Sequence, residues 1–146
     1  MQVNSTSYDT GWGGSAENAD IVAIVSGRFI GALGGRIFEM AATGAAAASS
    51  LDYTATLGGT EWVDIAGGPA GIYAAANANG TGSLYHIGVN SSDGTLSTPT
   101  VAGEMPRGET INSILIYNGV LLAATSEGLR TCLAVSYTHL RAHETA

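Results

Sequence analysis

The sequence predicts an all-β protein built from antiparallel repeats of about 44–48 residues, and two observations support this. First, three segments share one order of features: a short apolar strand, a glycine turn, an apolar strand rich in small residues, a second glycine turn and a third strand. Second, the 146 residues include 21 glycines and only three prolines, about twice the usual glycine content. Apolar runs lie between the glycines, which indicates tight turns and not a flexible linker. The three segments are residues 20–40, 61–89 and 111–134.

The turn glycines define the repeat length. In the first turn of each segment they are Gly27, Gly71 and Gly119, which are 44 and 48 residues apart. Those of the second turn are 45 and 48 residues apart, namely Gly35, Gly80 and Gly128. Gly80 and Gly119 each follow an asparagine, a dipeptide favoured where both central residues of a type I′ hairpin need positive φ. Strands joined by such closely spaced turns favour an antiparallel sheet.

Each repeat is expected to form one four-stranded unit. The middle strands, at 29–33, 72–76 and 120–124, combine bulky residues with Gly or Ala, which suits strands that crowd near a central axis. Fourth strands are expected at 53–57 and 98–102. Antiparallel repeats of about 40 to 50 residues are typical of propeller blades, so the sequence predicts a partial β-propeller of about three blades. A β-sandwich with coincidentally spaced glycines is the alternative, because both folds have regularly spaced short strands.

The chain divides into three regions. A polar lead-in covers residues 1–19, the partial propeller covers 20–134, and a tail covers 135–146. Within the repeats, the low-complexity segment 41–50 is expected to be a loop between blades, and 90–94 to end in an Asp-Gly turn between two strands.

The tail is predicted to be translated sequencing adapter. Residues 135–145 read VSYTHLRAHET, and one frame of a transposase-type sequencing-library adapter encodes these eleven residues in order. We therefore expect a disordered tail, a natural gene that continues past residue 134, and a metagenomic assembly as the source. His139 and His143 have the spacing of a metal-binding pair on a helix, with Glu144 beside them. An adapter was never selected for binding, so no metal site is predicted there.

Composition excludes two classes of partner. The net charge is −7 and the acidic residues are scattered without a basic cluster, so no nucleic-acid partner is predicted, because phosphate contacts supply most of that affinity. No apolar stretch approaches the roughly 18 residues of a membrane span, and the first residues are too polar for a signal peptide.

Cys132 is the only cysteine, which excludes an internal disulfide. N-x-[ST] triplets at Asn4, Asn79 and Asn90 have no weight without a signal peptide.

No catalytic, cofactor-binding or metal-binding residue is predicted, and the chain is interpreted as not an enzyme. The sequence lacks the nucleophile elbow, the phosphate-binding loop and the zinc-protease motif. The glycine-rich residues 31–36 fall in a strand–turn–strand segment, which offers no helix N-terminus to a dinucleotide. His86 has no evident partner and is interpreted as a half-exposed sheet histidine.

Four further features are interpreted structurally. Trp62 begins an apolar strand and is expected in the core, although Trp12 and Trp62 could instead line a carbohydrate surface. Asp64 is expected to face solvent or cap a turn, and Cys132 to act as a small hydrophobe. Residues 105–109, MPRGE, are interpreted as a connection between blades, with a contact loop as the alternative.

Residues 20–130 resemble the β-propeller-type minor tail proteins of tailed phages that infect high-GC Gram-positive bacteria. The matching text is SGRFIGALGGRIFEM at 26–40, WVDIAGGPAGIYAA at 62–75, SLYHIGVN at 83–90 and TPTVAGEMPRGETINSILIYNGVLLAATSEGLR at 98–130. The resemblance consists of the turns and the residue pattern of the strands, and it includes no catalytic residue. It implies a virion structural protein at the tail tip or baseplate. Its implied partners are other tail proteins, further copies of itself or a host-surface receptor.

Two alternatives stay open. Residues 83–97 resemble a blade of lactonase-like propeller enzymes, which would need acidic, Asn and His or Arg residues converging on a divalent metal. A cellular propeller that binds a partner protein through its face is the other alternative. Under each of these three interpretations, a partial propeller exposes open sheet edges, so self-association is expected.

Overall fold

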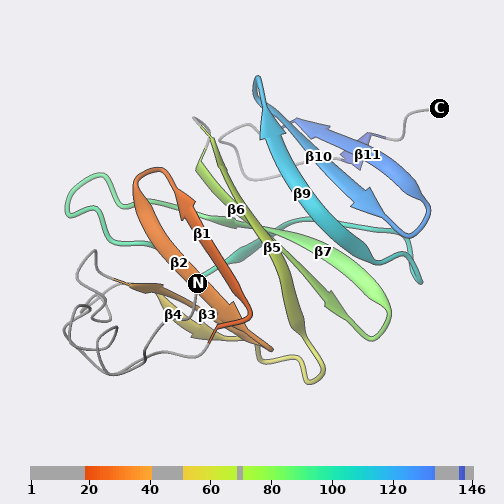
Figure 1. The fold of residues 1–146 in the computed structure, drawn as a ribbon, viewed down its shortest axis with the longest axis horizontal. Helices are drawn as coiled ribbons and strands as arrows, with labels where there is room; N and C mark the ends of the chain where they lie inside the picture. The colour runs from red at the N-terminus through yellow and green to blue at the C-terminus, as the bar shows by residue number, and fades with distance from the viewer. Residues whose placement is uncertain (1–18, 41–50, 69–70, 134–141, 144–146) are drawn as a thin grey trace, which may run out of the picture.

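The computed structural model describes residues 19–40, 51–68, 71–133 and 142–143. This part of the chain folds into three four-stranded antiparallel sheets and contains no helix (Figure 1). Neighbouring strands in each sheet are consecutive in the chain. The predicted all-β class with antiparallel repeats is therefore confirmed. No helix of the described residues is long and apolar enough to cross a membrane.

Each sheet corresponds to one sequence repeat. Sheet 1 comprises β1 Ile21–Val25, β2 Arg28–Leu33, β3 Arg36–Met40 and β4 Asp52–Thr54. Sheet 2 comprises β5 Glu61–Gly68, β6 Gly71–Ala78, β7 Thr81–Ile87 and β8 Thr100–Glu104. Sheet 3 comprises β9 Ile111–Tyr117, β10 Val120–Thr125, β11 Gly128–Leu133 and β12 Ala142–His143. The fourth strands β4 and β8 begin within two residues of the positions expected for them.

The tight turns have the predicted backbone conformation. Asn79 and Gly80 have φ of 52° and 79°, and Asn118 and Gly119 have φ of 51° and 76°. Positive φ at both central residues is the requirement of a type I′ turn, whose twist matches the flanking strands. Residues 26–27 adopt the same conformation without an asparagine. The turn chemistry therefore fixes where the first and second strands pair in sheets 1 and 3.

Sheet 2 lies between the other two sheets, and its first strand contacts the first strand of each. β5 contacts both β1 and β9 (Figure 1). One apolar core joins sheets 1 and 2, and a second joins sheets 2 and 3. The small residues of the middle strands were expected where strands crowd near an axis, whereas the contacts between sheets are made mainly by their first strands.

The small residues of β6 have a different physical reason. Successive side chains of a strand point to opposite faces. Ile72, Ala74 and Ala76 lie in the first core, whereas Tyr73 and Ala75 lie in the second, and all five are at most 2% exposed. β6 is thus apolar without alternation because both of its faces are buried.

The closest approach between sheets occurs at Gly67 and Gly68. Both precede Gly71, the predicted turn glycine of the second segment, and they end β5. A Cβ on Gly67 would lie 2.8 Å from Cβ of Val25, and one on Gly68 would lie 2.7 Å from Cγ2 of Ile116. Glycine at these two positions lets the β5 backbone lie against β1 on one face and β9 on the other.

Several predictions concern residues outside the described part. They include the loop at 41–50, Trp12, and the tail residues His139 and Glu144. Within the tail the structure describes only residues 142–143, which pair with β11.

Candidate functional site

Three of the residues singled out in the sequence have structural positions. Trp62 is 4% exposed, and its Nε1 donates a hydrogen bond of 2.8 Å to the carbonyl oxygen of Gly35. Cys132 is 1% exposed and lies in the second core. His86 is partly exposed on β7, with its ring centroid 5.1 Å from that of Tyr73. These placements agree with the interpretation of Trp62 and Cys132 as core residues and of His86 as a half-exposed sheet histidine.

Asp64 does not have the predicted position. Its Oδ1 accepts a hydrogen bond of 2.9 Å from the backbone N–H of Ile65, and its Oδ2 accepts one of 2.8 Å from that of Ile114. Asp64 therefore joins sheet 2 to sheet 3 instead of facing solvent or capping a turn. The pairing of β5 with β6 shifts between Trp62 and Asp64, and this bulge re-aims the side chain. Sequence alternation alone contains no sign of the bulge.

A second inter-sheet link was missed by the sequence analysis. The Nδ2 of Asn77 donates to the carbonyl oxygen of Ile111 at 2.9 Å, and the backbone N–H of Ile111 donates to Oδ1 of Asn77 at 2.8 Å. At the other junction, the backbone N–H of Trp62 donates to the carbonyl oxygen of Gly34 at 2.9 Å. In both cases the second hairpin of one sheet holds the start of the next. The only sequence signal was an asparagine near the end of an apolar strand.

The loop at 105–109 is a connection, as expected, and it ends in a buried ion pair. Glu109 is 2% exposed and accepts hydrogen bonds from Arg130, at 2.6 Å from Nε and 2.7 Å from Nη2. The hydroxyl of Thr125 donates to the same carboxylate. Hydrogen bonds from Arg130 hold the pKa of Glu109 below its ordinary range, while burial acts in the opposite direction and Thr125 lowers the pKa further.

A polar hollow of about 430 Å³ lies beside this loop. Its two most buried charges, Glu109 and Arg130, already neutralise each other, so their role is structural. The exposed Arg107 lies at the rim. The lining residues are Pro106, Arg107, Gly108, Glu109, Glu127 and Arg130.

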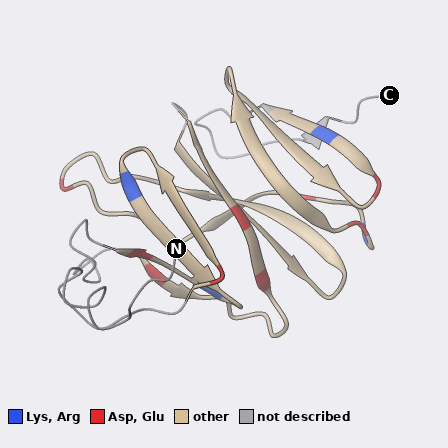
Figure 2. Ribbon diagram, in the orientation of Figure 1, with Lys and Arg blue, Asp and Glu red and all other residues tan. Residues whose placement is uncertain are grey.

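The other ion pairs belong to sheet 1. Arg28 donates to both oxygens of Glu39 and also to the carbonyl oxygen of Gly94, which attaches sheet 1 to the loop after β7. Arg36 pairs with the exposed Asp52 at 2.9 Å, and this hydrogen bond holds the pKa of Asp52 below its ordinary range. Figure 2 shows the charged positions dispersed over the three sheets. Among the described residues, no three His, Cys, Asp or Glu side chains are grouped closely enough to hold a metal ion.

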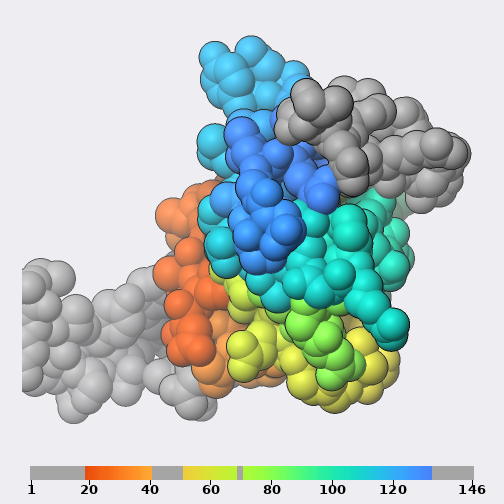
Figure 3. Space-filling model, turned by 90° about the vertical axis from the view of Figure 1, so that its right-hand side faces the viewer, coloured from red at the N-terminus to blue at the C-terminus, as the bar shows by residue number. Residues whose placement is uncertain are grey.

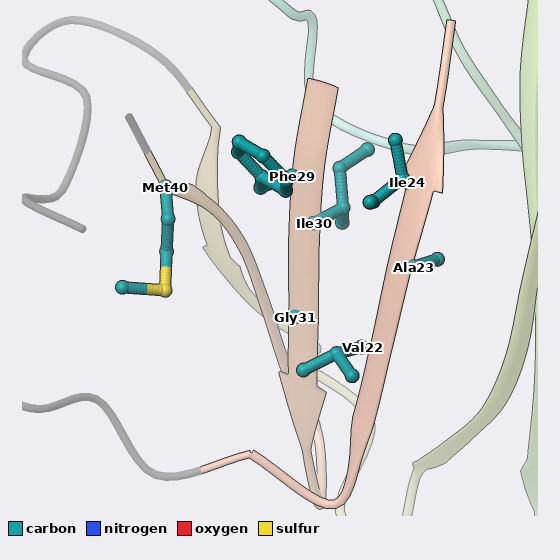
Figure 4. Close-up of a pocket in the computed structure, with 7 residues that line it drawn as sticks. All are labelled: Val22, Ala23, Ile24, Phe29, Ile30, Gly31 and Met40. Carbon is teal, nitrogen blue, oxygen red and sulfur yellow. The ribbon is translucent and has the colours of Figure 1, made fainter. Parts of the chain in front are cut away.

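The most accessible apolar feature is the face of sheet 1 that points away from sheet 2, which we call the sheet 1 outer face (Val22, Ile24, Phe29 and Met40). Val22 and Ile24 are 79% and 72% exposed, because the alternate residues of β1 pack toward the first core. These side chains border a hollow of about 380 Å³ between β1 and β2 (Figure 4).

Sheet 3 has a comparable surface, the sheet 3 outer face (Leu115, Tyr117, Val120 and Leu122). Leu115 and Tyr117 are 60% and 69% exposed, and Val120 and Leu122 are partly exposed. Figure 3 views the molecule from the side of this sheet, whose blue atoms lie at the surface. Exposed apolar patches of this kind mark protein interaction sites.

Comparisons with protein-family models, with curated proteins and with solved structures found no match to this chain. The two outer faces are the described surfaces best suited to protein contact, because they combine large apolar side chains with a regular sheet surface.

Proposed function

We propose that the three sheets are successive blades of a β-propeller, and that the protein is a non-catalytic structural component of a phage tail. The observation that supports the propeller most directly is the contact of β5 with both β1 and β9, which are the first strands of three sequential four-stranded meanders. Propeller blades are four-stranded antiparallel sheets arranged around a central channel. A two-sheet sandwich would not place one sheet between two others.

A structural role is supported by how the polar side chains are used. Asp64 and Asn77 both hydrogen-bond to the backbone of β9. Arg28 reaches the loop after β7, and Glu109 is paired inside the connection to sheet 3. These groups join one repeat to the next, which is what a stacked repeat protein needs.

The assignment to a phage tail comes from the resemblance over residues 20–130. The resemblance implies a protein of the virion, at the tail tip or baseplate, in contact with other tail proteins, with further copies of itself or with a host-surface receptor. The apolar outer faces supply surfaces for such contacts.

Independent sequencing of the source gene across residue 134, with adapters removed, tests this function. We expect further repeats at the same 44–48 residue spacing and neighbouring genes for tail proteins. Metal-ligating or catalytic side chains at matching strand ends, in a metabolic operon, would favour the lactonase-like alternative. A cellular gene context would favour the protein-binding propeller. Independent reads that continue through VSYTHLRAHET would refute the adapter interpretation and reopen the role of His139 and His143.

A further inference from the structure

The second strands of the three sheets share one order of side-chain sizes. They read FIGA at 29–32, IYAA at 72–75 and LLAA at 121–124, which is two large residues followed by two small ones. The two large residues of each strand point to opposite faces of its sheet. The pattern is therefore suited to a sheet that is covered on both faces.

Sheet 2 shows this two-sided burial. Its first large residue, Ile72, is 0% exposed in the core with sheet 1, and its second, Tyr73, is 1% exposed in the core with sheet 3. Each terminal sheet has one face in a core and one face that presents exposed apolar side chains, although Phe38, which shares the outer face of sheet 1, is only 1% exposed. Phe29 of sheet 1 and Leu122 of sheet 3 are partly exposed, whereas the residue beside each of them is buried in a core.

Both cores join the sheets in the same direction. In the first core, the second large residue of sheet 1, Ile30, meets the face of sheet 2 that contains the first large residue, Ile72. In the second core, Tyr73 meets the face of sheet 3 that contains Leu121. The two outer faces are thus complementary. The sheet 1 outer face presents the first large residue of the pattern, and the sheet 3 outer face presents the second.

The hairpin register supports the same correspondence. Val25 pairs with Arg28 and Tyr117 pairs with Val120, each across a two-residue turn, so Tyr117 occupies in sheet 3 the position of Val25 in sheet 1. Val25 is 7% exposed because it packs on sheet 2, whereas Tyr117 is 69% exposed. The sheet 3 outer face is therefore the counterpart of a face that already covers a neighbouring sheet.

We infer that, for the 146-residue chain, the sheet 3 outer face of one copy packs on the sheet 1 outer face of a second copy, head to tail, and that two copies of this chain close into a ring. This inference rests on the proposed propeller. Sheets 1 and 3 lie on opposite sides of sheet 2, so one copy does not join its own outer faces (Figure 1). Two copies supply six sheets, within the range of about four to eight blades in which propellers close. Head-to-tail contacts form a ring when the rotation closes.

Sedimentation velocity of the full chain and of two single-face variants tests the ring. For the wild type we expect a species of twice the 14.7 kDa mass. Ile24→Glu alters the sheet 1 outer face and Leu115→Glu alters the sheet 3 outer face, at side chains that are 72% and 60% exposed. Each variant alone should associate at least about thirtyfold more weakly and sediment as a monomer. Leu57→Glu, at a residue that is 57% exposed but on neither face, should behave as the wild type.

Mixing the two variants gives the decisive readout. Ile24→Glu retains an intact sheet 3 outer face, and Leu115→Glu retains an intact sheet 1 outer face, so an equimolar mixture should form a dimer that neither variant forms alone. That dimer has one junction and should be weaker than the closed ring. Far-UV circular dichroism confirms that each variant is folded, and Val22→Glu, at a residue 79% exposed, replaces Ile24→Glu if it is not.

Three outcomes would overturn the inference: a monomeric wild type, a mixture that stays monomeric, or association that continues beyond two copies. Loss of the dimer in only one of the two variants would also overturn it, since that indicates one face packing on itself. These outcomes leave the proposed tail function to be decided by the gene sequence and its neighbours.

Discussion

Replacing Arg130 with Met tests how strongly the buried pair with Glu109 stabilises the third sheet. Arg130 donates to both carboxylate oxygens of Glu109, whose side chain is only 3% exposed. In the variant, among the described residues, the Thr125 hydroxyl is the side-chain donor that remains for the Glu109 carboxylate. A buried carboxylate that loses its cation costs about 3–5 kcal/mol in the free energy of unfolding. This is a large part of the roughly 5–15 kcal/mol that stabilises a typical domain.

Urea unfolding at several protein concentrations measures the effect. With a slope of about 1–3 kcal/mol per molar urea, we expect the midpoint to fall by about 2 M. The matched control is Arg36→Met, because Arg36 also pairs with a carboxylate of a neighbouring strand, but the side chain of its partner Asp52 is 64% exposed. The control should lose no more than about 1 kcal/mol. Equal midpoint shifts in the two variants would refute the reasoning.

The pH dependence provides an independent check. Because the pKa of Glu109 in the folded wild type lies below its ordinary value of 4.5, the pair stabilises the protein above that pH. This stabilisation is lost as the pH falls through the folded-state pKa. In Arg130→Met, burial without the cation raises the pKa of Glu109, so the destabilisation is present at neutral pH and is relieved on acidification. The difference in stability between wild type and variant should therefore begin to narrow above pH 4.5, where the raised pKa of Glu109 in the variant lies, and should continue to narrow below pH 4.5 as the wild-type pair is protonated. A constant difference would contradict the assignment.

Two further predictions concern the junction between sheets 2 and 3. Asn77→Ala removes both hydrogen bonds to the buried backbone of Ile111 and should lower the free energy of unfolding by about 2–4 kcal/mol. The control Asn112→Ala, at an exposed residue of β9, should change the urea midpoint little. Gly82→Ala would place a Cβ 2.6 Å from Cγ1 of Ile111 and should cost about 1–3 kcal/mol by thermal unfolding. Gly58→Ala is its control, because an added Cβ there meets nothing within 4 Å, and a similar loss in that variant would argue against a steric cause.

Much of the fold was accessible from the sequence because its signals are local. Asn79-Gly80 and Asn118-Gly119 determine type I′ turns through positive φ, and the turns determine which strands pair. Short apolar runs between these turns are sufficient to identify strands and an all-β class. The structural interpretation of Trp62 followed from its position at the start of such a run.

The relation between sheets was not local and needed the tertiary structure. The run at 72–76 is apolar throughout because it lies between two cores, which periodicity cannot distinguish from crowding near an axis. Gly67 and Gly68 permit close contact of β5 with strands more than 40 residues away in either direction, which no local sequence pattern indicates. Asp64 was misplaced because a bulge, which leaves no mark in the sequence, turns its carboxylate toward β9.

The sequence by itself therefore determined the strands, their turns and the repeat, since each depends on neighbouring residues and backbone φ. The tertiary structure decided which polar side chains link the sheets, and which apolar faces are covered. Burial of a face depends on the element that packs against it, and that element is distant in the chain. The outer faces of sheets 1 and 3 became recognisable as a pair only after the two inner junctions showed how such faces meet.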